Sequence, residues 1–144
     1  MKKGFMELKR NEATINRPEG DRVLDASYVF VDLPEFERQL RAEKAWEKND
    51  RNGITVFKTD QLTIVLTLLH AGAAIPENKV EGLLTIHVLR GSVRVNTVDG
   101  DAELQEGQLI SFHSGEPHSV TALTEASILI WNYSNVAKRE EQLL

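Results

Sequence analysis

The stretch "IPENKVEGLLTIHVLRG", Ile75 to Gly91, decides the fold. Its centre, "LLTIHVL", places bulky apolar side chains at every second position, which is typical of a buried strand. The segment before this centre contains Pro76 and Asn78 and reads as an opening turn, and the "RGS" that follows reads as a closing turn. The stretch therefore predicts turn, strand and turn, with no helix.

Short strand signals separated by turn signals continue on both sides of this stretch, from residue 54 onward. "ITVFKT", "QLTIVLTLLH", "SVRVNTV", "QLISFHS" and "ASILIWNY" are rich in β-branched and aromatic residues. "VDGD" is the clearest turn, because Asp-Gly supports the turn with positive φ that joins twisted antiparallel strands. About eight strands at this spacing in one small domain predict a β-sandwich or β-barrel.

The segment before these strands has helical spacing. In "LPEFERQLRAEKAWEKND", Pro34 lies in the first turn, and Phe36 and Leu40 are four residues apart. Asp32 or Leu33 is the expected N-cap. We predict one amphipathic helix over about residues 34–47, packed outside the barrel.

These signals divide the chain into three parts. Residues 1–22 are polar and are expected to form an extended surface arm. Residues 23–134 form a single domain that begins with a strand in "VLDASYVFVDL", includes the helix, and contains a barrel over about 54–133. Residues 135–144 are a charged C-terminal tail.

Composition limits the partners and the location of the protein. The net charge of the 144 residues is -5, and the basic residues are scattered, so neither nucleic acid nor an anionic membrane is an expected partner. The longest apolar run, "LTIVLTLL", is too short to span a bilayer. There is no cysteine, which excludes disulfides, thiolate metal sites and cysteine nucleophiles. We expect a cytoplasmic protein.

The glycine spacing from Gly72 onward resembles the conserved barrel of the cupins, which are small double-stranded β-helix, or jelly-roll, proteins. The first cupin motif begins and ends with glycine, and Gly72 and Gly91 match these positions. In the second motif, Gly107, Gly115 and His118 match. The resemblance covers about 60 residues and implies an all-β jelly-roll barrel with the helix outside it.

The ligand positions of the cupin metal site match less well. Counting back from Gly91, the family's glutamate falls on Leu84, its second histidine on Val80 and its first on Asn78. In the second motif, His113 replaces the proline. Apolar side chains coordinate nothing, and iron, manganese and zinc need several imidazole and carboxylate ligands. We therefore expect no family-type metal and no other cofactor.

Two functions remain open at this point. The first is binding of a small organic molecule in an apolar-lined barrel, with His118, Asn78, Val80, Leu84 and His113 as the pocket residues. The second is a cupin enzyme of the oxygenase or isomerase type. It would use either His118 as a general base or a divalent transition metal held by His118, His113 and Asn78. Glu77 or Glu116 would complete such a rearranged metal site.

The apolar strands also predict self-association. His87 lies an odd number of residues from Leu84, so the two side chains belong to opposite faces of their strand. The face that carries His87 includes apolar residues of "LTIVLTLL" and "ASILIW". Burying such a face against a copy of the same chain is common, so we predict a homodimer built from this face and the N-terminal strands.

Overall fold

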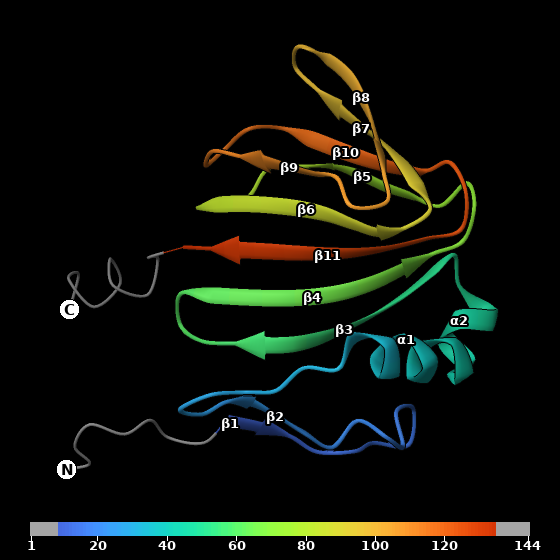
Figure 1. Ribbon diagram of the computed structural model, residues 1–144, viewed down its shortest axis with the longest axis vertical. Helices are drawn as coiled ribbons and strands as arrows, with labels where there is room; N and C mark the ends of the chain where they lie inside the picture. Colours follow the sequence, from blue (N-terminus) through green and yellow to red (C-terminus); the bar gives the residue numbers. More distant parts are fainter. Residues whose placement is uncertain (1–8, 135–144) are drawn as a thin grey trace.

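The computed structural model describes residues 9–134, whose two larger antiparallel sheets are stacked as a jelly roll (Figure 1). The first sheet contains, in spatial order, β3 (Arg51–Lys58), β4 (Leu62–Leu69), β11 (Ala126–Tyr133), β6 (Leu83–Arg90) and β9 (Leu109–Phe112). The second contains β5 (Ala74–Asn78), β10 (His118–Ala122), β7 (Ser92–Thr97) and β8 (Gly100–Gln105). The prediction of an all-β jelly roll is confirmed.

The core between the two sheets is built from the apolar positions of the alternating strands. In β6, Leu84, Ile86 and Val88 are buried, whereas Thr85 and His87 are only partly buried. This is the pattern expected of a strand with one inward face. The other sheet supplies facing residues, so that apolar area is removed from water on both sides. Members of this core include Leu69, Val93, Val95, Leu104, Phe112, Val120, Ala122 and Ile128.

The glycines of the two cupin-like motifs lie in turns that need a left-handed backbone. Gly72, Gly91, Gly107 and Gly115 have φ between 78° and 86°. At Gly91 a Cβ atom would also lie 2.2 Å from the carbonyl oxygen of Glu125, so no other residue fits without displacing the chain. The glycine spacing therefore reflects the path that the backbone takes.

Two short helices cover part of the outer face of the five-stranded sheet. They are α1 (Leu33–Ala42) and α2 (Lys44–Lys48). Leu40 and Trp46 pack against Leu66, Leu68 and Leu129, which form a second apolar core on that face. A helical segment outside the barrel is thus confirmed. No helix within residues 9–134 has the length and apolar character needed to cross a membrane.

The predicted start of the helix is confirmed at its cap, but the prediction of one continuous helix over 34–47 is wrong. The Asp32 side chain accepts a hydrogen bond of 3.2 Å from the Glu35 amide. The break comes at Glu43, whose backbone is extended, with φ −84° and ψ 149°. Its carboxylate accepts hydrogen bonds from Arg17 and Asn52, and these contacts hold the residue out of helical conformation.

The N-terminal part differs from the expected arm. Within residues 9–22 the chain is not simply extended, because β1 (Lys9–Asn11) pairs with β2 (Arg22–Asp25) as a hairpin beside β3 (Figure 1). The strand predicted in "VLDASYVFVDL" is restricted to β2 and ends at Asp25. The barrel itself begins at Arg51 instead of residue 54. Residues 1–8 and the predicted tail 135–144 lie outside the described residues.

The opening turn predicted around Pro76 is a strand instead. β5 is an edge strand, paired on one side with β10. Proline is tolerated there because an edge strand leaves one row of its amides unpaired. Pro76 lies where the register shifts: Ile75 is opposite Val120, and Asn78 is opposite His118. The shift determines which residue of β5 lies opposite the histidine.

Candidate functional site

His118 is the centre of the candidate site. It opens β10, is 7% exposed, and stacks on Phe112 with 5.0 Å between the ring centroids. Its Nδ1 lies 3.2 Å from the backbone carbonyl of Glu116. A carbonyl oxygen only accepts, so Nδ1 carries the hydrogen, and in the neutral ring Nε2 is left as an acceptor.

Asn78 lies directly across from His118 in the β5–β10 ladder. The structure therefore brings together these two residues, which are 40 positions apart in the sequence. The side chain of Asn78 is turned to its own backbone, because its Oδ1 accepts a hydrogen bond of 2.9 Å from the amide of Lys79. The amide oxygen that would serve as a metal ligand already has a partner.

Val80 and Leu84 belong to the apolar core. Leu84 is 5% exposed and lies opposite Phe112 in the β6–β9 ladder, and Val80 packs in part against the same core. By the motif count, these side chains stand at two positions where the cupin motif has metal ligands. One imidazole and one engaged amide do not fit iron, manganese or zinc. Among residues 9–134, no group of three or more His, Asp and Glu side chains is arranged to hold a metal ion.

His113 lies in the turn before β10 and is exposed. The turn is closed by the Glu116 amide, which donates to the His113 carbonyl at 3.4 Å. Within the described part of the chain, no contact joins the rings of His113 and His118. Glu116 reaches His118 through its backbone carbonyl and not through its carboxylate.

A small hollow of about 150 Å³ adjoins His118 at this end of the four-stranded sheet. Ser119 donates to the Oδ1 of Asn96 at 2.8 Å, and the amide nitrogen of Asn96 donates to Asp101 at 2.6 Å. Asn96 and Ser119 occupy no motif position, so the sequence alone does not single them out. The β10–β7 pairing brings them together. The lining consists of Glu77, Asn96, Thr97, Val98, Pro117, His118 and Ser119.

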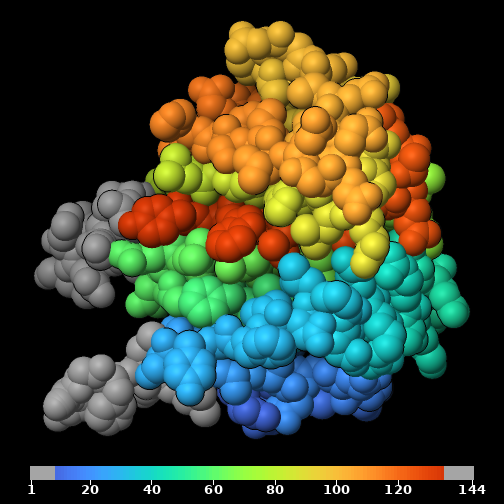
Figure 2. Space-filling model, viewed as in Figure 1, coloured from blue at the N-terminus to red at the C-terminus, as the bar shows by residue number. Residues whose placement is uncertain are grey.

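His87 lies on the outer face of the five-stranded sheet. This is expected, because it is an odd number of residues from the inward-facing Leu84. There it borders a shallow apolar groove of about 330 Å³. We call this groove and its rim the outer patch, formed by Leu62, Leu83, Thr85, His87, Leu109, Trp131 and Tyr133. In Figure 2, the red residues of β11 reach the surface between the green of β4 and the yellow-green of β6, beside the blue and cyan N-terminal segment.

His70 has a structural role. It follows β4, as expected for a residue near a rim, and stacks on Trp46 with ring centroids 3.5 Å apart. Its Nε2 lies 2.7 Å from the backbone carbonyl of Trp46 and donates to it. The pair ties α2 to the end of β4, so we assign His70 to packing rather than to the site.

Comparisons with known proteins identify the fold but no activity. No protein-family model matches the sequence, and no curated protein matches it. Solved structures do match. The cupin domain of Cnp3 from Schizosaccharomyces pombe superposes with a TM-score of 0.61 at 11% identity, over 96% of each chain.

Two further matches show how widely this fold is used. Salicylate 1,2-dioxygenase from Pseudoaminobacter salicylatoxidans gives a TM-score of 0.65 at 17% identity, covering 90% of this chain but 37% of that one. A cupin superfamily protein from Desulfitobacterium hafniense gives 0.59 at 15% identity, over 60% of this chain and 80% of that one. At these identities the likeness shows the fold alone.

Proposed function

Because the chain has the cupin fold, we propose that it binds a small organic molecule beside His118, without a metal of the family type. Two features occurring together support this proposal. Leu84 and Val80 occupy the metal-ligand positions with core side chains, and a hollow lined by polar groups adjoins the one histidine that remains. Such a site binds by shape and by a few hydrogen bonds.

The lining of the hollow favours a neutral, hydroxylated ligand. Ser119, Thr97 and Asn96 supply hydroxyl and amide groups, and Nε2 of His118 supplies an acceptor. The carboxylate of Glu77 opposes binding of anions. The volume is that of a small molecule and leaves no room for a nucleotide or a peptide.

A titration of the full ¹⁵N-labelled chain with glycerol, glucose and benzoate, followed by amide chemical shifts, tests this proposal. We expect the two hydroxylated probes to shift the resonances of Asn96, Ser119 and His118, and benzoate to leave them unchanged. Asn96→Ala should abolish the shifts. Asn11→Ala, an exposed asparagine of β1, is the matched control and should retain them. Perturbation confined to other regions, or none at the solubility limit of both hydroxylated probes, would overturn the proposal.

The alternative is a cupin enzyme of the oxygenase or isomerase type. The orientation of His118 favours it, because a ring whose Nδ1 donates to a carbonyl presents Nε2 as a general base. A metal held by His118, His113 and Asn78 would require the Asn78 amide oxygen to leave the Lys79 amide. Elemental analysis of the purified protein tests the metal-dependent form of this enzyme, since it requires a stoichiometric transition metal.

A further inference from the structure

The edge of the five-stranded sheet is covered in an unusual way. β3 is the last strand on its side, and the β1–β2 hairpin beside it is a separate sheet. Two arginine side chains bridge the gap. Arg22 Nε donates to the carbonyl of Thr55 at 2.8 Å, and Arg17 Nη2 donates to the carbonyl of Gly53 at 2.8 Å.

These two carbonyls are the ones that another strand would use. In an antiparallel ladder, alternate residues direct both N–H and C=O toward the same neighbour. Gly53 and Thr55 are two residues apart, and their carbonyls point away from β4, toward the free edge. An open edge of this kind pairs readily with a strand from another chain unless something blocks it.

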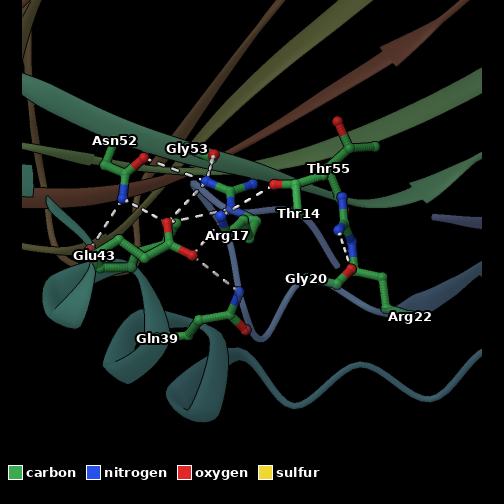
Figure 3. A network of polar contacts seen from close by, with 10 residues as sticks. Thr14, Arg17, Gly20, Arg22, Gln39, Glu43, Asn52, Gly53 and Thr55 are labelled. Carbon is green, nitrogen blue, oxygen red and sulfur yellow. Dashed lines mark hydrogen bonds and ion pairs between the residues drawn. The ribbon is translucent and has the colours of Figure 1, made fainter. Parts of the chain in front are cut away.

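The position of Arg17 is fixed by a buried polar network (Figure 3). Its guanidinium donates to the carboxylate of Glu43 at 3.0 Å and to Asn52 at 3.3 Å. Glu43 is itself held by Asn52 at 3.0 Å and by Gln39 at 3.2 Å. The contact of Arg17 with Glu43 is charge-assisted, because it joins a guanidinium to a carboxylate. The burial of the Glu43 side chain shields this contact from solvent.

Gly20 joins the two arginines. Its carbonyl accepts a hydrogen bond of 2.7 Å from Arg22 Nη1. A Cβ atom at Gly20 would lie 2.6 Å from Cγ of Arg17, so the arginine stem lies directly over the glycine. Gly20 has no positive φ, so alanine there is opposed by contacts with Arg17, whose side chain it would displace and whose carbonyl oxygen would lie 3.1 Å from the added Cβ.

We propose that residues 14–25, which we call the clasp, mask the edge of β3 against pairing with β3 of a second copy. Arg17 and Arg22 hold the clasp on the edge of β3, and the buried Leu24 and the exposed Glu19–Arg38 ion pair also anchor it to the fold. Because side chains replace a backbone ladder, the clasp can detach without unpairing any strand of the sheet. The exposed edge would then pair antiparallel with its copy and join two five-stranded sheets.

The test compares Arg17→Met/Arg22→Met with Arg10→Met. Methionine keeps the apolar stem but removes the donors. Among the described contacts, Arg10 pairs with the exposed Asp21 of the clasp and not with β3, and an exposed ion pair contributes little. Amide hydrogen exchange of residues 14–25 should become about tenfold faster or more in the double variant, because each charge-assisted bond contributes on that scale. Light scattering should show a larger species than for the wild type. Arg10→Met should match the wild type in both.

Two more variants separate edge pairing from general damage. Gly20→Ala keeps every donor but displaces Arg17, so it should also give faster exchange in the clasp. Thr55→Pro removes the outward amide of β3, and added to the double variant it should restore the wild-type mass. If amide hydrogen exchange in residues 14–25 is as slow as in the wild type in both Gly20→Ala and the double variant, the clasp proposal is wrong. A larger species that persists with Thr55→Pro would overturn the edge pairing.

Discussion

At the scale of the residue, the account depends on positions 78, 80, 84 and 118. Counting from Gly91 predicts apolar Leu84 and Val80 at two ligand positions of the cupin motif, and the structure places both against the core. The loss of the metal stays a prediction. The sequence did not predict what Asn78 does. Its position opposite His118 depends on the register shift around Pro76, and no local sequence pattern predicts that shift.

Truncation of Leu84 tests whether this residue is core or lines an open cavity. Leu84→Ala should lower the free energy of unfolding by about 3 kcal/mol, because it deletes buried methyl groups and leaves a void. Val98→Ala, at a position 67% exposed in the β7–β8 turn and outside the outer patch, should change it by less than about 0.5 kcal/mol. Urea denaturation measures both. A cost of Leu84→Ala as small as that of the control would mean that the side chain lines empty space.

The tautomer of His118 is a second prediction at this scale. The contact of Nδ1 with the Glu116 carbonyl requires that the neutral ring carry its hydrogen on Nδ1. Long-range ¹H–¹⁵N correlation spectra distinguish the two tautomers. Exposed His113 serves as an internal reference, since its ring has no such partner among the described contacts. A neutral His118 protonated on Nε2 would contradict the assigned geometry and remove Nε2 as the acceptor for a ligand.

At the scale of the element, the helical segment shows what local patterns predict and what they miss. The cap at Asp32 and the apolar face with Leu40 follow from local spacing. The break at Glu43 does not, since it depends on Arg17, a residue 26 positions away that reaches the carboxylate only in the folded chain. Burial raises the pKa of Glu43, but hydrogen bonds from Asn52, Arg17 and Gln39 outweigh burial and hold the pKa below its usual 4.5.

This lowered pKa predicts how stability depends on pH. The contribution of Glu43 should be fully present above pH 4.5, where the carboxylate is ionised in both states, and be lost as the pH falls through the folded-state pKa. Glu43→Gln should therefore cost about 2 kcal/mol at pH 7 and progressively less below pH 4. Exposed Glu47→Gln should be neutral throughout. A cost of Glu43→Gln that is independent of pH would contradict the network.

At the scale of the whole molecule, the sequence predicted that both faces of one sheet are apolar. Helices α1 and α2 cover one part of the outer face, and the outer patch is the remainder. That division was not predictable, because it depends on where the broken helix docks. The patch contains no Asp, Glu, Lys or Arg, so two copies of this acidic chain could meet there without repulsion. The cytoplasmic location remains a prediction.

The homodimer is the prediction that belongs to this scale. Wild-type protein at micromolar concentration should have the mass of a dimer by light scattering. Leu109→Glu, in the outer patch, should give a monomer, because it places a charge in an apolar interface. Val98→Glu is the matched control: this side chain is 67% exposed, but it lies in the β7–β8 turn of the other sheet. A monomeric wild type, or a dimer that survives Leu109→Glu, would refute this interface.

We propose that this barrel kept the cupin shape and lost the metal. The most direct measurement is the melting temperature of chelator-treated protein after addition of Fe(II), Mn(II), Ni(II) or Zn(II). A metal at a hundred times its dissociation constant would stabilise the fold by about 2.7 kcal/mol, or several degrees at this chain length. We predict no such shift in melting temperature with any of the four metals. A shift of that size that disappears in His118→Ala but persists in outer-face His87→Ala would contradict this prediction.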